Sequence, residues 1–349
     1  MPTPLISICL PNLNTLPFLE ERMETILAQT MTDWQLIICD SYSDDGSWEF
    51  FQKFKQDPRV VVFQASRKGS PGSWNYCLEH AQGEYLYIAT SDDTMSAECL
   101  EELLKPLESD KELDLAICDF ERIDEEGRVL QEDHRPLTFI EDWTATPCIR
   151  NGATEFLLHA SFGPTWVTMT TVLFRREILQ KTGLFPVHLG PVGDTAWAMR
   201  ANLASDTAYV PGRFATWRER KDQASHSIVS RDDFRQMLDC VRSVSRDRSL
   251  EVPNHWKEIP GWRAEIPSVW YREYCNTFSL YREEARSDPK AFFCNLFAAL
   301  IKEPMFVLGQ FRRGFGRPPS FSFDRIETAR QLIKQFQTPW PPKAVDTGW

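Results

Sequence analysis

The stretch YLYIATSDDTM, residues 85–95, runs from an apolar segment of strand length directly into two adjacent carboxylates. Its first residues alternate aromatic and aliphatic side chains, which is typical of a buried β-strand. Asp92 and Asp93 then stand side by side, although like charges repel and turn formation does not require both of them. The pair indicates a positive group at this strand end, with a metal ion or a lysine as candidates and water alone as the plain alternative.

Short apolar runs of the same kind recur through the first part of the chain. They cover residues 5–10, 34–39, 60–63 and 113–118. Between the first two runs, one stripe of a helix is formed by Leu16, Leu19, Met23, Ile26 and Leu27. Strands and helices that alternate at this pace predict an α/β fold with a mostly parallel sheet and flanking helices. Ligand sites in such folds lie at the carboxyl ends of the strands, so the polar residues there are the first candidates for function.

The overall composition is that of a soluble globular protein. The 349 residues are 42% hydrophobic and 26% charged, and the formal net charge of −11 argues against a nucleic-acid partner. Nine scattered cysteines without a C-x-x-C pair favour reduced thiols, with Cys9, Cys39 and Cys118 in apolar runs. The start of the sequence resembles no leader, and the longest apolar run, residues 291–301, is shorter than the ~20 residues that span a bilayer. We expect a cytoplasmic protein.

The character of the chain changes twice. Residues 119–146 are charged and without periodicity, which predicts a loop or an irregular hairpin. A strand-like run follows at residues 167–174, and a helix is expected from Asp194 to Leu203. Beyond residue 230 strand-like runs cease and Arg, Trp and Phe become frequent. We expect one domain over residues 1–230 and a mainly helical extension over residues 231–349 that ends in a Pro-rich tail.

Four strand ends carry polar clusters. These are PNLN at 11–14, DSYSDDGS at 40–47, ASRKGSPGSWN at 65–75 and TSDD at 90–93. Each cluster alone has a structural interpretation, because Asp, Asn, Ser and Gly form turns and cap helices. Together, in a parallel sheet, they line one edge. A nucleotide diphosphate bound there needs a carboxylate for its nucleoside and a hard cation for its phosphates, and Mg²⁺ or Mn²⁺ held by Asp92 and Asp93 meets the second need.

The order and spacing of these motifs resemble the inverting family 2 glycosyltransferases of the GT-A fold, over about residues 4–226. The resemblance implies a Rossmann-like nucleotide-diphospho-sugar transferase domain over residues 1–230. It assigns contacts with the donor nucleotide to Pro11, Asn12, Leu13, Asn14, Asp40, Ser41, Lys68, Asn75, Ser91, Asp92 and Arg218. It assigns a Mn²⁺ or Mg²⁺ ion to Asp92, Asp93 and His226.

The sequence departs from the family pattern at four of these places. Ser41 stands where a second aspartate is common, and Leu13 where a tyrosine often lies against the base. Trp74 replaces the arginine that usually precedes the asparagine matched by Asn75. Thr90 replaces the first carboxylate of the D-x-D metal motif, so Asp93 and the donor phosphates must supply further oxygens.

The resemblance also implies a catalytic base. In GLFPVHLGPVGDTAWAMR, residues 183–200, Asp194 matches the family aspartate that opens a helix after a G-x-F segment. A carboxylate there takes the proton of the acceptor hydroxyl. The structural alternative is an aspartate that caps its helix, and one residue can do both. Arg218 and Arg220 are alternative phosphate contacts, and His226 is either a metal ligand or a phosphate contact.

These features predict a metal-dependent inverting transfer from a nucleotide sugar, with UDP favoured, to a hydroxyl of a saccharide or lipid-linked acceptor in surface polysaccharide or glycolipid synthesis. A nucleotidyltransferase would carry a Gly-rich basic loop after the first strand, and residues 11–18 contain none. A non-catalytic nucleotide- or sugar-binding relative stays open because of Thr90 and Ser41. The aromatic and basic residues beyond 262 predict either helices packed on the first domain or a peripheral contact with the inner face of the membrane.

Overall fold

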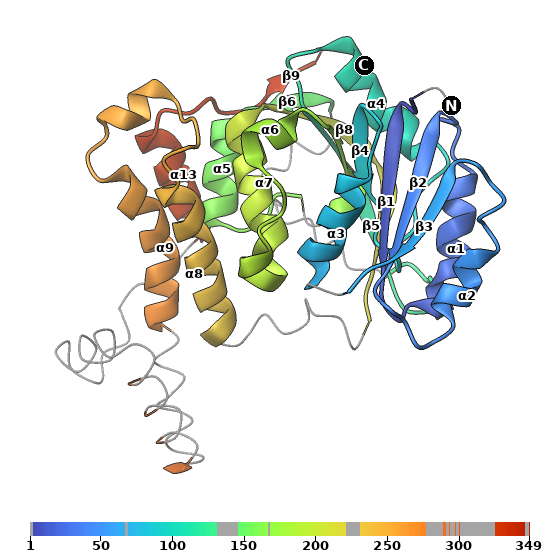
Figure 1. The fold of residues 1–349 in the computed structure, drawn as a ribbon. Coiled ribbons are helices and arrows are strands. Elements are labelled where there is room, and N and C mark those ends of the chain that lie inside the picture. The colour runs from blue at the N-terminus through green and yellow to red at the C-terminus, as the bar shows by residue number, and fades with distance from the viewer. Residues whose placement is uncertain are drawn as a thin grey trace.

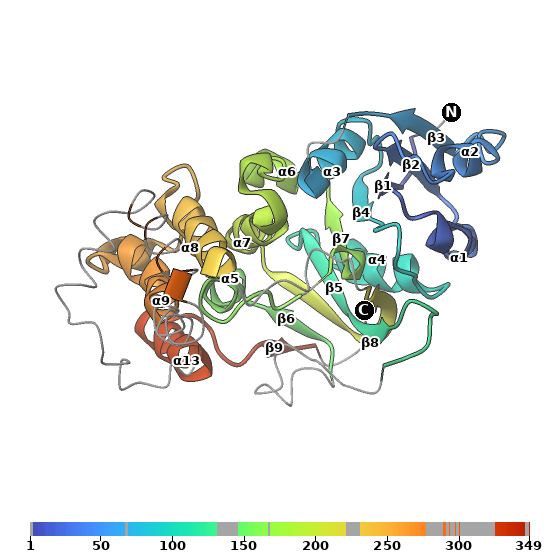
Figure 2. The same ribbon diagram turned by 90° about the horizontal axis from the view of Figure 1, so that it is seen from below.

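The computed structural model describes residues 3–66, 69–130, 146–166, 168–220, 231–276 and 325–345, together with residues 289, 290, 293, 297, 300 and 349. Its strands form one sheet with the order β3-β2-β1-β4-β7-β5-β8-β6-β9. Helices α8, α9 and α13 lie together at one end of the molecule, beyond α5 and α7, and α1 and α2 lie at the other end (Figures 1 and 2).

The first four strands confirm the predicted βαβ units. The elements of this half are β1 (Ile6–Asn12), α1 (Leu16–Leu27), β2 (Trp34–Asp40), α2 (Ser47–Gln52), β3 (Val60–Gln64), α3 (Gly69–Glu79), β4 (Tyr85–Ile88) and α4 (Cys99–Ser109). β1 pairs in parallel with β2 and β4, and β2 pairs in parallel with β3. Asn12 therefore lies beside Asp40, and Asp40 beside Gln64, so these strands end at one edge.

The second half of the sheet is mixed, whereas the sequence predicted a mostly parallel one. Its elements are β5 (Leu115–Ile123), β6 (Cys148–Arg150), α5 (Gly152–Ser161), the 3-10 helix η2 (Met169–Thr171), β7 (Val172–Arg175), α6 (Ile178–Thr182), the 3-10 helix η3 (Val187–Val192), α7 (Gly193–Ala204) and β8 (Thr207–Arg218). β7 runs antiparallel to both β4 and β5, and β6 runs antiparallel to β8. Short apolar runs do not encode strand direction, which is why the pattern missed this change.

The predicted loop over residues 119–146 is shorter than expected. β5 continues through Asp119 to Ile123 and pairs with β8. Residues 119–122 are charged or half-buried because this end of the strand lies at the surface, so the apolar signal stops before the strand does. Residues 131–145 lie outside the described part of the chain.

Both faces of the sheet are covered. Alternate residues of β1 point to opposite sides: Ile8 packs with α1, α2 and α4, and Cys9 packs with α3, α6 and α7. Seven cysteines of the described residues are buried and free, as predicted for Cys9, Cys39 and Cys118.

The C-terminal part is mainly helical in its described residues. It contains α8 (Arg231–Arg246), the 3-10 helix η5 (Asn254–Glu258), α9 (Trp262–Asn276), α13 (Arg325–Gln335) and the short strand β9 (Lys343–Ala344). A single apolar cluster joins α5 and α7 to these helices, with Phe156 and Met199 packed among Val241, Trp256 and Phe336. β9 also pairs with β6, so residues after 231 complete the sheet as well as extending it. The boundary at residue 230 stays a prediction.

None of the helices in the described part of the chain has the length and hydrophobicity that a membrane crossing requires.

We expect Ser7→Ala to lower the free energy of unfolding by about 1–3 kcal/mol. The hydroxyl oxygen of the fully buried Ser7 accepts hydrogen bonds from the backbone N–H groups of Gly83 at 2.8 Å and Gln82 at 3.2 Å. Alanine leaves the Gly83 N–H without an acceptor. Urea unfolding measures the loss. Ser109→Ala is the control, because its exposed hydroxyl donates to the carbonyl of Lys105 and should matter by less than about 0.5 kcal/mol. Equal losses in both variants would contradict the assignment.

Candidate functional site

The ends of β1 and β2 are held together by the carboxylate of Asp40. Asp40 is fully buried, and its oxygens accept hydrogen bonds from the Asn12 amide at 2.8 Å and from the backbone N–H and hydroxyl of Ser43 at 3.0 and 2.6 Å. Gln64 of β3 approaches it at 3.4 Å. Asp40 therefore organises the loop that would meet a nucleoside, and its own contact with a ligand stays a prediction.

The neighbouring predicted residues are gathered at the same edge. Asn14 and Asp44 exchange two hydrogen bonds, at 2.8 and 3.0 Å, which fasten the loop after β1 to the loop after β2. Pro11 and Leu13 flank Asn12 and are half-buried. The hydroxyl of Ser41 lies 3.2 Å from that of Ser73 in α3. The structure therefore confirms that the polar clusters after the first strands lie together at one edge of the sheet.

Asn75 connects this edge to the segment before α7. Its side-chain amide donates to the carbonyl of Phe185 at 2.8 Å, and its oxygen accepts the N–H of Phe185 at 2.9 Å. Both hydrogen-bonding groups of the amide are therefore used within the protein. Asn75 thus positions the chain that leads to Asp194, and its direct contact with the donor stays a prediction. Lys68 and His226 lie outside the described residues.

The side chain of Asp93, one of the predicted metal ligands, is turned into the protein. It is 2% exposed. One oxygen accepts the backbone N–H of Arg218 at 2.7 Å, and the other accepts the hydroxyls of Thr90 and Thr170, the latter at 3.3 Å. Burial and the adjacent Asp92 raise the pKa of Asp93 to about 7. Its oxygens accept hydrogen bonds from three segments of the protein, and its role as a metal ligand stays a prediction.

Arg22 of α1 is an unexpected neighbour of this carboxylate. Its side chain is completely buried, its guanidinium lowers the pKa of Asp93 by its charge, and no described residue accepts a hydrogen bond from it. The signal was present in the sequence, because Arg22 falls on the apolar stripe between Leu19 and Met23. A charge on a buried stripe requires an opposite charge nearby.

The structure shows which positive group lies beside the adjacent carboxylates Asp92 and Asp93. Nη1 of Arg220 lies 3.4 Å from Oδ2 of Asp92, and both side chains are 16% exposed. The positive group beside the pair in this structure is therefore an arginine. Ser91, on the other side of Asp92, is buried. The ring of Phe18 lies under both neighbouring guanidinium groups, 5.0 Å from that of Arg218 and 5.5 Å from that of Arg220.

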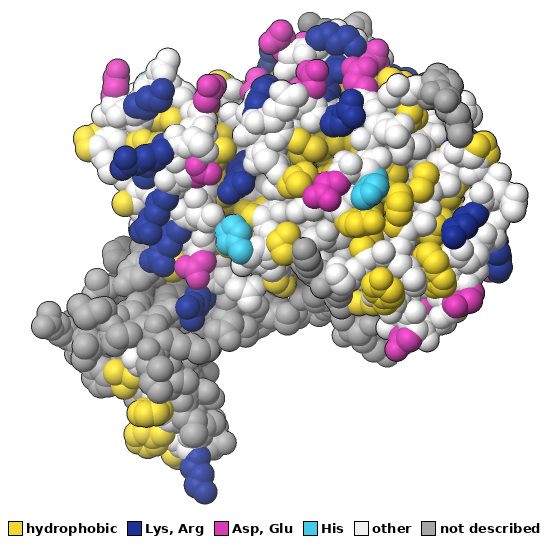
Figure 3. Space-filling view, viewed as in Figure 1, with side chains coloured by type: hydrophobic (Ala, Val, Ile, Leu, Met, Phe, Trp, Pro, Cys, Tyr) yellow, Lys and Arg dark blue, Asp and Glu magenta, His cyan; other side chains and the backbone are white. Residues whose placement is uncertain are grey.

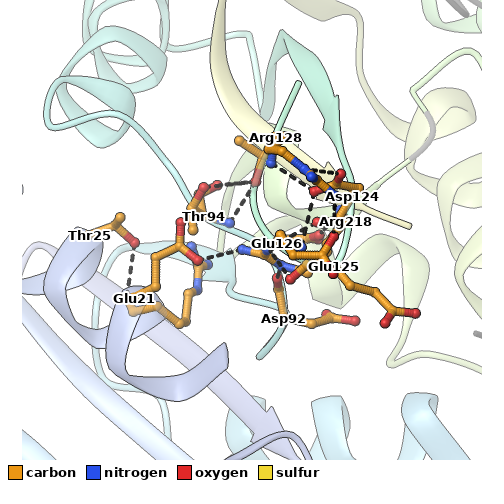
Figure 4. A network of polar contacts seen from close by, with 12 residues as sticks. Glu21, Thr25, Asp92, Thr94, Asp124, Glu125, Glu126, Arg128 and Arg218 are labelled. Carbon is orange, nitrogen blue, oxygen red and sulfur yellow. Dashed lines mark hydrogen bonds and ion pairs between the residues drawn. The ribbon is translucent and has the colours of Figure 1, made fainter. Parts of the chain in front are cut away.

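Arg218, a predicted contact of the donor nucleotide, has a guanidinium with several protein partners. It is 1% exposed, and its guanidinium donates to the carbonyls of Asp92, Asp124 and Glu125 at 2.6, 3.1 and 3.2 Å and to the carboxylate of Glu21 at 2.6 Å (Figure 4). These groups occupy the donors that a phosphate would need. Arg220, two residues later and more exposed, is the remaining candidate for a phosphate contact.

The residues fit a divalent ion only together with a ligand. Among the described residues, no group of three or more His, Cys, Asp or Glu side chains is arranged to hold a metal. Asp92 contributes one carboxylate at the edge, since Asp93 is turned inward. Mg²⁺ and Mn²⁺ are commonly bound by one or two carboxylates plus substrate phosphates, so Asp92 suffices if a diphosphate supplies the other oxygens.

Asp194 stands in the first turn of α7. Gly193 packs so closely on α3 that an added Cβ would lie 2.8 Å from Cγ of Pro71. Oδ1 of Asp194 accepts the N–H of the adjacent Thr195 at 2.6 Å. The capping alternative is wrong, because α7 already begins at Gly193 and its first turn has no side-chain cap. No described residue donates to Oδ2 of Asp194. Burial raises the pKa of Asp194. Cys240 of α8 lies near Asp194. Burial raises the pKa of the Cys240 thiol, and the negative charge of Asp194 raises it further.

The first half of the sheet is parallel and has carboxylates at its strand ends, and a further carboxylate stands at the start of α7. This arrangement is that of the GT-A nucleotide-diphospho-sugar transferases. Solved structures share this fold. S. aureus TarS 1-349 in complex with UDP matches with a TM-score of 0.59 and 16% identity, over 98% of this chain and 94% of that one. The mannosyltransferase PcManGT from Pyrobaculum calidifontis in complex with GDP-Man and Mn²⁺ matches with a TM-score of 0.55 and 17% identity, over 96% and 88%.

The chain belongs to glycosyl transferase family 2, whose family model matches residues 7–183. A curated relative, the uncharacterized glycosyltransferase EpsJ of Bacillus subtilis, is 28% identical over 186 residues. The match covers 52% of this chain and 51% of EpsJ, so this chain spans about half the length of that relative.

We expect Arg218→Met to lower the free energy of unfolding by about 2–4 kcal/mol, because three partly buried carbonyls lose their donor and the side chain that fills this site changes shape. Arg213→Met is the control: it removes a half-exposed arginine on the same strand, 3.3 Å from Glu121, and should change stability little. Urea unfolding followed by circular dichroism measures both variants. Equal stability of Arg218→Met and wild type would show that Arg218 is free to serve a ligand.

Proposed function

We propose that this protein transfers a sugar from a nucleotide-diphosphate donor, with a UDP-sugar favoured, to a hydroxyl of a saccharide or lipid-linked acceptor, in surface polysaccharide or glycolipid synthesis. The observation that supports the proposal is that Asp92 follows the parallel strand β4, while Asp194 stands in the first turn of α7, whose Gly193 packs on Pro71 near the start of α3. Family membership supports it, as do the UDP complex of TarS and the GDP-Man complex of PcManGT.

Asp194 is the proposed base. The proton of the acceptor hydroxyl passes to Oδ2 of Asp194, which has no donor among the described residues. The freed oxygen attacks the anomeric carbon, and the bond from that carbon to the diphosphate breaks as the diphosphate leaves. Attack from the side opposite the leaving group inverts the anomeric configuration. A pKa raised by burial makes this carboxylate a stronger base than an exposed aspartate.

Asp92 is the proposed holder of a divalent cation, Mn²⁺ or Mg²⁺, together with the donor phosphates. The cation would stabilise the negative charge of the departing diphosphate. PcManGT, which was solved with Mn²⁺, supports the use of such an ion. Arg220 lies 3.4 Å from Asp92, so its guanidinium would bind a phosphate oxygen beside the cation.

A non-catalytic nucleotide- or sugar-binding relative is the second candidate. The Asp92–Arg220 ion pair favours it, because a carboxylate that already has a cationic partner needs no metal. The two candidates differ at Asp194, since only an enzyme requires it for turnover.

The proposed location is the cytoplasm, with a peripheral contact at the inner face of the membrane through the C-terminal part. Phe293 and Phe297, four residues apart in helical segments, are 66% and 67% exposed. Exposed aromatic rings on a helix are suited to the boundary between lipid headgroups and acyl chains.

We expect one of UDP, GDP, CDP and dTDP to bind in calorimetric titrations, and to bind more tightly with Mn²⁺ than without it. Mn²⁺ alone should bind weakly, because Asp92 is the only carboxylate among the described residues that we place on the ion. Asp92→Ala should abolish the gain from Mn²⁺. Asp110→Ala should keep it, because this half-exposed carboxylate accepts the N–H of Glu112 and lies at the end of α4. Absence of binding by all four nucleotides, with and without Mn²⁺, would refute the proposal.

We expect Asp194→Asn to abolish transfer while leaving nucleotide affinity unchanged. In the wild type the rate should rise with pH through the Asp194 pKa, which burial places above the ordinary aspartate value, since only the ionised base accepts a proton.

The raised pKa of Asp194 in the folded protein also affects stability. The free energy of unfolding falls as pH rises from the pKa of the unfolded chain through that of the folded protein. Asparagine removes that buried charge, so the variant should unfold at an equal or higher urea concentration at pH 8. Transfer at the wild-type rate by a folded Asp194→Asn protein would exclude Asp194 as the base.

A further inference from the structure

Tyr42, at the carboxyl end of β2, has a conformation that folding alone does not favour. Its φ is 57°, in the left-handed region, and its side chain is 62% exposed. Bulky residues in this region are strained, and an exposed aromatic ring gains little from burial. Glycine would adopt this backbone conformation without strain. The side chain at this position therefore requires a reason other than stability.

The loop around Tyr42 is held firmly on both sides. Before it, Ser41 is buried, with its hydroxyl 3.2 Å from that of Ser73 in α3. After it, Ser43 donates its N–H and its hydroxyl to the buried Asp40 and accepts the backbone N–H of Asn14 at 3.0 Å. The strained residue is thus fixed by hydrogen bonds of its neighbours, and the ring is presented to solvent from a rigid base at the proposed donor edge.

The surroundings of Tyr42 on the α3 side are apolar and aromatic. Ser41, which precedes Tyr42, contacts Ser73 of α3, and Tyr76 lies about one turn further along that helix. Tyr76 in turn packs edge-on against Phe63 of β3, with ring centroids 5.8 Å apart. Hydrophobic side chains cover much of the surface over α3 and the adjoining strands (Figure 3). An aromatic ligand stacked on Tyr42 would lie on the side of the molecule that carries this apolar surface.

We propose that Tyr42 is the platform on which the base of the nucleotide donor stacks, and so a residue that determines nucleotide affinity and choice of base. The proposal rests on the proposed function, because it requires a nucleotide at this edge. Stacking uses the face of the phenol ring, while the phosphates extend from the base toward Asp92 and Arg220. A fixed ring loses little conformational freedom when the base binds, which is the advantage that the strained loop provides.

The test compares Tyr42→Gly, Tyr42→Phe and wild type with the nucleoside diphosphate that wild type binds best, and with inorganic pyrophosphate, both in the presence of Mn²⁺. Tyr42→Gly should weaken nucleotide binding at least about tenfold, or ~1.4 kcal/mol, and leave pyrophosphate binding unchanged. Tyr42→Phe keeps the ring and should stay within about twofold of wild type, on the scale of a single aromatic stack. Val61→Ala, an exposed apolar residue of β3, is the control for loss of apolar surface and should bind as wild type does.

Unfolding in urea separates binding from folding. Tyr42→Gly relieves the left-handed strain, so its stability should equal or approach that of wild type despite the greater freedom of glycine in the unfolded chain. Wild-type nucleotide affinity in a folded Tyr42→Gly protein overturns the platform and leaves the proposed function intact. Equal weakening of nucleotide and pyrophosphate also overturns it, since the effect then lies on the phosphates. Failure of wild type to bind any of the four nucleotides overturns the proposed function, and the platform with it.

Discussion

The buried carboxylate of Asp93 connects three segments that are far apart in the sequence. It accepts hydrogen bonds from Thr90 after β4, from Thr170 in η2 and from the backbone of Arg218 at the end of β8. An ionised carboxylate is costly to bury unless it is paired and hydrogen-bonded, and the buried guanidinium of Arg22 supplies the opposite charge. Because Asp93 is directed inward, its neighbour Asp92 is placed at the edge of the sheet. Asp93 thus holds the structure together, and Asp92 is the carboxylate left for the proposed cation.

The same edge illustrates how an acidic protein can receive a phosphate ligand. The guanidinium of Arg218 donates its hydrogen bonds to backbone carbonyls and to Glu21. These bonds hold the loop around residues 124–128 against the strand ends. Arg220 instead faces Asp92 and is less buried. A diphosphate with its cation could exchange partners with this ion pair, the phosphate meeting Arg220 and the cation meeting Asp92. Such an exchange conserves charge at the edge, so neither side chain is left unpaired in either state.

The helical C-terminal part is coupled to the proposed base. Cys240 of α8 lies against the carbonyl of Val192 and near the carboxylate of Asp194, and one apolar cluster joins α5 and α7 to α8, α9 and α13. These helices help to exclude water from Asp194 and so contribute to its raised pKa. The family model ends at residue 183, whereas Asp194 and its neighbour Cys240 lie beyond it.

Much of the fold was predictable from local pattern. Apolar runs and a helical stripe identified the first four strands and α1, because burial on both faces of a parallel sheet leaves a continuous apolar signal in the sequence. The strand-end clusters identified the edge, since parallel strands that end together bring their polar residues together. The antiparallel course of β7 and the extension of β5 to Ile123 were missed, because strand direction and a half-buried strand end leave no local signature.

The sequence by itself determined which residues could reach the site: the carboxylates after the strands, the asparagines beside them and the aspartate that opens α7. Only the tertiary structure decided which of them remain accessible to a ligand. Asp93, Asn75 and Arg218 have protein partners in the described residues, whereas no described residue donates to Oδ2 of Asp194 and the ring of Tyr42 lies in solvent. The physical reason is that hydrogen-bond partners and burial are set by segments more than a hundred residues apart, which no local pattern of residue types records.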